Sequence, residues 1–290
     1  MNKKSMDRIT ILMPLKNYHP VFLDKSIKSV FNQTSSAWNL LIIVQKKDLK
    51  KFQEILKHRL SDSRVKIILK KGYQLAGSIN SGMKSAATNF VAILHSDDVW
   101  APEAVETLLR YISKNPDIDF FHSSRLKINE NDDQISQVYQ SKETFTVEDF
   151  KLGSPVKHLL CWRKEKALSI GGIDERLYSV GPDDYDFPWT MAENGATFKA
   201  IPECLYIYRE HLKAFRLTTH LPLSVHKRGI KRILKKHGVE KEIIEKRIAQ
   251  GEKTYLRECL YKNRPERFFK NFSSFFKIYC RKLIEAVSKY

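Results

Sequence analysis

Apolar and polar positions vary along the first 122 residues in a pattern typical of a sheet covered by helices. Short continuous apolar runs predict buried strands, and apolar residues three and four positions apart predict amphipathic helices. Strands and helices follow one another in turn, so we expect a parallel sheet with right-handed crossovers and helices on both faces. The predicted strands are 9–12, 40–44, 65–69, 90–94 and 118–122, and the helices between them follow residues 20, 49, 72 and 103.

After His122 the pattern becomes mixed. Residues 124–139 alternate around a polar centre and predict a hairpin, whereas 157–162 and 198–208 predict further strands. From about residue 222 the chain reads as helical and basic. We therefore predict an α/β fold with a mixed sheet over 1–220 and a basic helical extension over 221–290.

The composition adds a strong charge asymmetry. Among 290 residues, 42% are hydrophobic and 11% aromatic, which favours a folded globular protein over a disordered one. The net charge is +18, and residues 221–290 carry 19 Lys and Arg against 7 Asp and Glu. Such an appendage indicates an anionic partner. Near the end, apolar residues of 268–287 share one helical face, which suits packing on the first domain, an in-plane membrane contact or oligomerisation.

Cysteine usage and the N-terminus bear on location. The four cysteines lie far apart and form no CxxC pair, so they predict no metal-thiolate site and suit a reducing compartment. The apolar run 9–15 is short and is broken by Pro14, which makes a poor signal peptide and no membrane span. We expect a cytoplasmic protein.

The strand at 90–94 ends on His95, Ser96, Asp97 and Asp98. Ligands collect at the carboxyl ends of strands in open α/β sheets, and adjacent carboxylates there suit a divalent cation with a diphosphate. An N-cap for the following helix explains the same residues equally well.

A second acidic cluster, Gly181-Pro-Asp-Asp-Tyr-Asp, precedes another predicted helix. Taken alone, it is more readily explained as a helix cap, because acidic residues favour helix N-termini. Four other histidines have no partner that the sequence identifies, and we interpret them as surface or loop residues: His19, His58, His158 and His237.

Seven short motifs occur in one order along residues 9–211: ILMPLKN, SVFNQT, SINSG, ILHSDDVW, GGIDE, DDYD and YREH. In this order and at this spacing, the chain resembles the inverting nucleotide-sugar glycosyltransferases of family 2, which have the GT-A fold. The resemblance implies a sugar transfer in which a general base takes the proton of the acceptor hydroxyl. It assigns that role to Asp184, with Asp183 beside it where Glu is usual. Trp189 follows on the predicted helix, where it belongs to the core or a pocket wall or, being close to Asp184, stacks on the acceptor sugar.

The resemblance also implies a cation, Mn²⁺ or Mg²⁺, that stabilises the leaving diphosphate and is bound by Asp97 and His211. The family's DxD signature is altered here, because His95 replaces its first acid. Gln45 replaces the aspartate that usually reads the base, and Ile79 replaces a frequent arginine. The residues expected to contact the nucleotide-sugar are Pro14, Lys16, Asn17, Gln45, Asn80, His95, Ser96, Asp98 and Arg209.

We therefore predict a metal-dependent inverting glycosyltransferase of surface polysaccharide or glycoconjugate synthesis. Its donor would be a UDP-sugar and its acceptor a saccharide or lipid-linked saccharide. The basic extension would contact the anionic inner face of the plasma membrane. A degenerate relative that only binds nucleotide-sugars or partners is the alternative. A nucleic-acid-binding protein is disfavoured because no binding module is recognisable.

Overall fold

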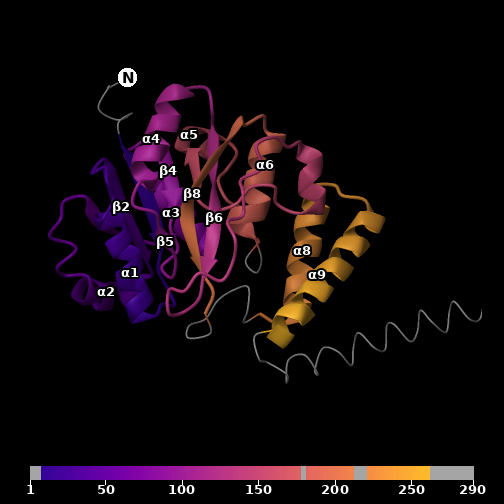
Figure 1. Ribbon diagram of the computed structural model, residues 1–290, viewed down its shortest axis with the longest axis horizontal. Coiled ribbons are helices and arrows are strands. Elements are labelled where there is room, and N and C mark those ends of the chain that lie inside the picture. Colours follow the sequence, from indigo (N-terminus) through magenta and orange to yellow (C-terminus); the bar gives the residue numbers. More distant parts are fainter. Residues whose placement is uncertain (1–7, 178–180, 212–220, 262–290) are drawn as a thin grey trace, which may run out of the picture. The chain divides into compact units, whose positions relative to one another are not determined.

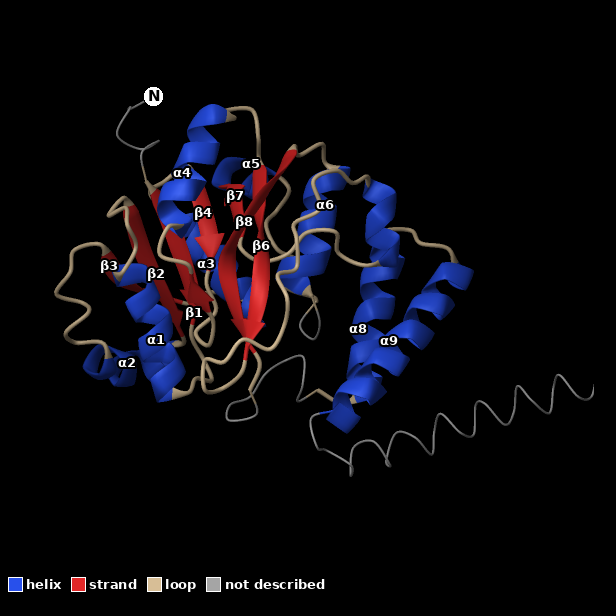
Figure 2. Ribbon diagram, in the orientation of Figure 1, coloured by secondary structure: helices blue, strands red, loops and turns tan. Residues whose placement is uncertain are grey.

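The computed structural model describes residues 8–177, 181–211 and 221–261. The chain forms two compact units, Met1–His220 and Leu221–Tyr290. The first unit is an eight-stranded sheet with helices on both faces, in the strand order β3-β2-β1-β4-β7-β6-β8-β5 (Figure 1 and Figure 2). This mixed α/β architecture agrees with the predicted fold class.

The N-terminal half of the sheet is parallel, as its alternating pattern predicts. Strands β1 to β4 pair in parallel in the spatial order β3-β2-β1-β4. The four strands predicted for this half are each found within two residues of their expected bounds, whereas the strand predicted at 118–122 continues to Ile128 as β6. The elements of this half are β1 (Ile9–Pro14), α1 (Pro20–Phe31), β2 (Trp38–Val44), α2 (Leu49–Ile55), β3 (Val65–Leu69), α3 (Gln74–Ser85) and β4 (Phe90–Ile93).

The second half is mixed. Strand β7 runs antiparallel to both β4 and β6, whereas β8 runs parallel to β6 and carries the edge strand β5. Its elements are β5 (Val99–Trp100), α4 (Ala104–Lys114), β6 (Phe120–Ile128), a 3-10 helix (Val147–Leu152), β7 (Leu160–Arg163), α5 (Lys164–Ser169), a π-helical turn (Pro182–Asp186), α6 (Phe187–Glu193) and β8 (Phe198–Arg209).

The predicted hairpin at 124–139 is only partly correct. Its first arm is the second half of β6, because β8 continues beside that strand as far as Arg209. The returning arm pairs with β6 only through two bridges, Arg125 with Tyr139 and Ile128 with Gln134. Strand β5 was not predicted, since two residues are too few to show a period.

Two apolar cores lie on opposite faces of the sheet. One core joins alternate residues of β1 and β2 to α1, α2 and α4, and the other joins the intervening residues to α3, α5 and α6. Thus Ile11 and Leu12, neighbours in β1, enter different cores. Burial on both faces explains why these strands read as continuous apolar runs.

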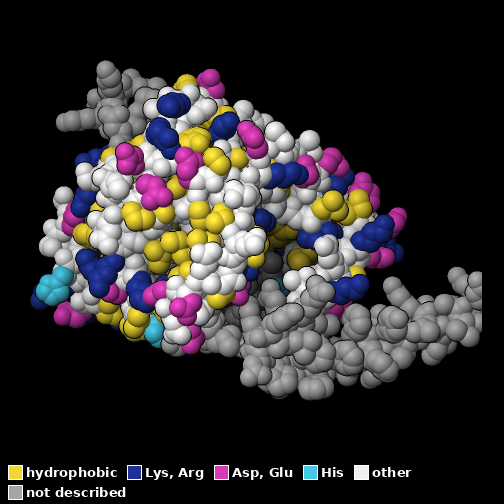
Figure 3. Space-filling model, in the orientation of Figure 1, with side chains coloured by type: hydrophobic (Ala, Val, Ile, Leu, Met, Phe, Trp, Pro, Cys, Tyr) yellow, Lys and Arg dark blue, Asp and Glu magenta, His cyan; other side chains and the backbone are white. Residues whose placement is uncertain are grey.

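The surface of the described residues carries mixed charge. On the face shown in Figure 3, basic and acidic side chains are interspersed among apolar and neutral ones. The excess of positive charge in the sequence belongs mainly to residues 221–290.

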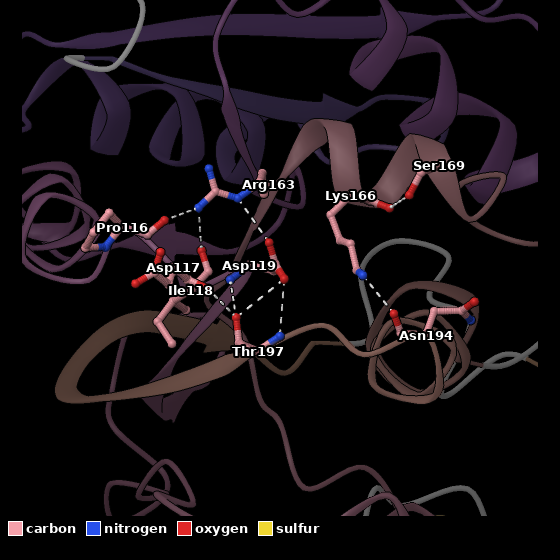
Figure 4. A network of polar contacts seen from close by, with 9 residues as sticks. All are labelled: Pro116, Asp117, Ile118, Asp119, Arg163, Lys166, Ser169, Asn194 and Thr197. Carbon is pink, nitrogen blue, oxygen red and sulfur yellow. Dashed lines mark hydrogen bonds and ion pairs between the residues drawn. The ribbon is translucent and has the colours of Figure 1, made fainter.

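A polar network joins the starts of β6 and β8 to the end of β7 (Figure 4). Arg163 Nε donates to Asp119 Oδ1 at 3.0 Å, and its Nη2 donates to the Ile118 carbonyl at 3.0 Å. The amide of Asp119 donates to Thr197 Oγ1 at 3.1 Å. The network therefore ties this end of the three strands together.

The second unit contains a helical hairpin, α8 (Leu223–Lys236) and α9 (Lys241–Tyr261). Gly238, at φ 66°, supplies the left-handed turn between them. Leu223 packs on Tyr255, whose hydroxyl donates to the Leu221 carbonyl at 3.2 Å. Among the described helices, none is long and apolar enough to cross a membrane. The Phe-rich face at 268–287 lies outside the described residues.

Candidate active site

Most of the residues predicted for the nucleotide-sugar lie at the ends of three neighbouring parallel strands, whereas Asn80 lies on α3 and Arg209 ends β8. Lys16 and Asn17 are exposed in the loop after β1, Gln45 is half-buried after β2, and the 95–98 segment follows β4. Because β2, β1 and β4 are adjacent and parallel, their carboxyl ends share one edge of the sheet. Pro14, the half-buried last residue of β1, and buried Ser96 lie at this edge as well.

Asp183 is bound to His95 across this edge. Gly181 takes a left-handed conformation, at φ 57°, and starts the π-helical turn that carries both aspartates. His95 Nε2 lies 3.2 Å from Asp183 Oδ2. Burial opposes a charge on His95, but its hydrogen bond to Asp183 and the nearby carboxylates raise its pKa to about 9. The same bond outweighs burial at Asp183 and lowers the pKa of that carboxyl. The two groups form a hydrogen-bonded ion pair.

Asp184, the predicted general base, has a different environment. Removal of water by the surrounding protein and the negative charge of Asp183 raise its pKa to about 6. Its side chain nevertheless keeps 47% of its surface exposed, against 7% for Asp183. A carboxylate with a raised pKa that solvent can reach is suited to accept a proton near neutral pH.

His158 corrects one prediction from the sequence. It is buried, not a surface residue, and its ring packs on Tyr206 and His95 at centroid distances of 5.1 and 5.3 Å. Its Nε2 lies 4.0 Å from the nearest carboxylate oxygen of both Asp183 and Asp184. Burial and the charge of His95 lower its pKa to about 3, so the ring is neutral. The apolar run after His158 places it at the start of a strand, but nothing in the sequence indicates its partners.

His95, His158 and Asp183 also form a potential cation site. One ligand atom from each residue lies within 4.8 Å of the others. Two imidazole nitrogens and a carboxylate suit a transition metal. A metal there would replace the hydrogen bond between His95 and Asp183.

Asp97 and His211, which the resemblance assigns to the cation, lie close together. His211 Nε2 lies 3.1 Å from Asp97 Oδ2, although 114 residues separate them. The Asp97 side chain is 26% exposed, whereas that of His211 is fully buried and packs on Phe22 at 4.6 Å. One carboxylate oxygen and one imidazole nitrogen fit Mn²⁺, whose other positions diphosphate and water can fill.

Asp98 and Arg209 are buried and bound to protein groups. Asp98 accepts hydrogen bonds from the Tyr206 hydroxyl and from the Arg209 amide, both at 2.7 Å. Arg209 donates to the carbonyls of Asp97 and Asn129 at 2.9 and 3.0 Å. Its guanidinium pairs with Asp132 at 2.6 Å. In this arrangement both residues hold the loop that carries Asp97, and they expose no group to a nucleotide.

Asn80 has a similar internal role. Its side-chain amide donates to the Ile173 carbonyl at 2.9 Å and to Glu175 Oε1 at 3.1 Å, and its oxygen accepts from the Ile173 amide at 2.9 Å. Gly172, at φ 77°, allows this contact, since a Cβ there would lie 2.5 Å from Asn80 Oδ1. The SINSG and GGIDE motifs thus contact each other directly through Asn80, and this contact forms a junction between them.

Trp189 belongs to the core. It is 1% exposed and stacks on Phe150 at 5.7 Å, with Tyr185 at the same distance on another side. An acceptor sugar cannot reach its ring in this arrangement. The spacing of aromatic residues in the sequence could not show whether Trp189 lies in the core or lines a pocket.

Two cations beside Asp184 were not predicted. Arg125 on β6 and Lys157, next to His158, both lower the pKa of Asp184 against the larger effects of burial and Asp183. Neither stands in a recognised motif. Only the pairing of β6 with the segment before β7 brings them to the acidic turn.

The fold is similar to that of a known protein. S. aureus TarS in complex with UDP superposes with a TM-score of 0.57 at 14% identity, covering 88% of this chain and 72% of TarS. At that identity the likeness shows the fold alone.

Two Escherichia coli proteins are similar in sequence. The O-antigen biosynthesis glycosyltransferase WbnJ is 28% identical over 219 residues, 74% of this chain and 84% of WbnJ. UDP-Glc:alpha-D-GlcNAc-diphosphoundecaprenol beta-1,3-glucosyltransferase WfgD is 32% identical over 125 residues, 42% of this chain and 47% of WfgD. The model of glycosyl transferase family 2 matches residues 10–166. The chain has the GT-A fold and is a glycosyltransferase that belongs to family 2.

Proposed function

We propose that the protein transfers a sugar, with inversion, from a UDP-sugar to a hydroxyl of a saccharide or lipid-linked saccharide. The observation that carries the proposal is the paired acidic turn. One aspartate is held as an ion pair by His95, and the other is half-exposed with a pKa of about 6. Two carboxylates in such different environments suit two different roles.

In the proposed reaction Asp184 accepts the proton of the acceptor hydroxyl. The oxygen forms a bond to the anomeric carbon from the face opposite the diphosphate, and the bond to the diphosphate breaks with its electron pair. Inversion follows from this single displacement. Asp183, fixed by His95, positions its neighbour and keeps the pKa of Asp184 raised.

Asp97 and His211 would hold Mn²⁺ or Mg²⁺. When bound there, the cation supplies positive charge for the leaving diphosphate. The role of this chain is to bring two ligand atoms together at 3.1 Å, with Arg209 fixing the backbone of Asp97. The exposed side chains of Lys16 and Asn17 and the half-buried Gln45 are the groups we expect to meet the nucleotide.

The donor and acceptor classes rest on similar proteins. A solved structure of TarS contains UDP, WfgD is named for a diphosphoundecaprenol-linked acceptor, and WbnJ is named for O-antigen biosynthesis. A UDP-sugar and a lipid-linked saccharide of surface polysaccharide synthesis are therefore our first candidates.

A membrane contact through α8 is part of the proposal. This helix has no acidic residue, and five exposed cations follow at spacings of three and four: Arg228, Lys231, Arg232, Lys235 and Lys236. Positions so spaced share one face of a helix. Such a face suits anionic lipid at the inner side of the plasma membrane, where a lipid-linked acceptor would be found.

The first test is a thermal-shift screen with UDP-, dTDP- and GDP-sugars, each with and without Mn²⁺. A ligand that binds only the folded state raises its apparent stability. We expect a Mn²⁺-dependent shift with UDP-sugars that Asp97→Ala removes, and hydrolysis or transfer that Asp184→Ala abolishes while ligand binding remains. Binding without turnover by the wild type would instead indicate a degenerate binding protein, and no shift with any nucleotide would refute the proposal.

A further inference from the structure

Arg125 and Lys157 lie next to each other beside the acidic turn. The pairing of β6 with β7 brings His122 opposite Leu160. The antiparallel pairing continues for one more residue, because the Ser123 amide donates to the Leu159 carbonyl at 3.1 Å. Two residues further along both segments, Arg125 and Lys157 follow. Lys157 also directly precedes His158, whose Nε2 is 4.0 Å from Asp184 Oδ2.

These two cations lie near the Asp184 carboxylate but form no ion pair with it. In the part of the chain that the structure describes, no carboxylate oxygen lies within 4.0 Å of either side chain's nitrogens. Lys157 Nζ donates to the Ser154 carbonyl at 2.9 Å, and the Arg125 guanidinium packs on Tyr208 and Tyr139 at 5.1 and 5.9 Å. Its Nε is buried and has no hydrogen-bond partner.

Nearby cations of the same sheet are paired. Lys127, two residues along β6, binds Glu210 at 2.7 Å, and Arg163 at the end of β7 binds Asp119 at 3.0 Å. Burial and the charge of Arg125 lower the pKa of Lys157, which reflects the cost of two neighbouring positive charges away from water. The charge of Asp184 offsets this cost only in part, because one carboxylate acts on two cations, and a bound anion would neutralise the remainder.

We propose that Arg125 and Lys157 form an anion-binding subsite that takes a phosphate or carboxylate group of the acceptor. The guanidinium offers a planar fork for two oxygens, and the ammonium adds a point charge. Both cations act on Asp184, the proposed base, which must face the acceptor hydroxyl; this step rests on the proposed function. The acceptor is therefore an anionic saccharide whose charged group lies near its reactive hydroxyl.

The test compares glucose 6-phosphate, glucuronate and glucose as probes, titrated into the full-length protein with saturating UDP and Mn²⁺. Calorimetry should give glucose 6-phosphate or glucuronate at least tenfold tighter binding than glucose. Arg125→Gln and Lys157→Gln should each lower this preference by about tenfold, and the double variant should abolish it. Lys127→Gln, which removes a paired cation from the same strand, should leave it unchanged. The affinities for glucose 6-phosphate and glucuronate show whether the subsite prefers a phosphate or a carboxylate.

Equal affinity for all three probes in the wild type would overturn the inference. So would a fall in UDP affinity by the same factor in both variants, because the pair would then serve the donor's diphosphate. If Arg125→Gln does not fold, Lys157→Gln alone decides, since its side chain has one hydrogen bond to lose. Anion binding that depends on both cations in a protein that binds no nucleotide would refute the proposed function and leave the subsite standing.

Discussion

Asp184→Asn should inactivate the enzyme and stabilise its fold. The protein raises the pKa of Asp184 from 3.8 to about 6. Between these values the folded state holds a proton that the unfolded state has lost, so ionisation at higher pH favours unfolding. An uncharged, nearly isosteric amide removes this penalty.

The magnitude follows from the shift and the exposure. A difference of roughly 2 pH units corresponds to about 3 kcal/mol for a fully buried group. Because 47% of the side chain meets solvent, screening reduces the expected gain to about 1 kcal/mol. For a unit of this size that gain raises Tm by about 2–4 °C. Loss of the base should lower transfer by about 10²–10⁴-fold.

Calorimetric scans of both proteins at pH 7.5 and pH 5 check the reasoning. The stability gap should be complete above pH 6 and should shrink as the pH falls towards 3.8, where the wild-type carboxyl is protonated in both states. Asp117→Asn, at an exposed aspartate near the opposite edge of the sheet, is the matched control and should show no such gap. An inactive Asp184→Asn protein that is no more stable than the wild type at pH 7.5 would refute the assigned environment.

Three further measurements test the site. The wild-type transfer rate should rise with pH through about 6 and then level off, because the base must be ionised; a rate unchanged down to pH 5 would exclude Asp184 as that base. Tyr206→Phe removes the buried hydroxyl that donates to Asp98, and urea unfolding should show a loss of about 1–3 kcal/mol. Asn80→Ala removes three hydrogen bonds to the GGIDE segment and should cost a similar amount; an unchanged urea midpoint would show that the junction contributes nothing.

The sequence predicts the parallel half of the fold well because its signals are local. Strands β1, β2 and β4 are apolar runs buried on both faces, β3 at the edge is a partly exposed apolar strand, and each crossover helix has its own period. The second half is harder, because its strands are defined by partners distant in sequence. β6 extends to Ile128 only because β8 runs beside it, and two-residue β5 exists only as an edge for β8.

The residues of the candidate site were also predicted only where the sequence signal is local. Motif order places Asp97, His211 and the two aspartates at one edge, because these residues stand at strand ends or in a recognisable turn. Motif order could not distinguish residues that contact a ligand from residues that hold the ligand-contacting side chains in place, because both kinds are polar and occur in the same motifs. Asn80 and Arg209 are of the second kind. His158, Arg125 and Lys157 were missed because the pairing of β6 with β7 alone creates their environment.

Asp132 and Arg209 tie the hairpin tip to the loop that carries Asp97. The guanidinium of Arg209 binds Asp132, and Lys25 of α1 binds the same carboxylate. Loops vary among relatives more than the strands they connect, and here such a change would remove the ion pair that supports the backbone next to the proposed cation site. A chimera that imports another hairpin must therefore import the acid at its tip as well, or it will displace Asp97 without altering any residue that meets a ligand.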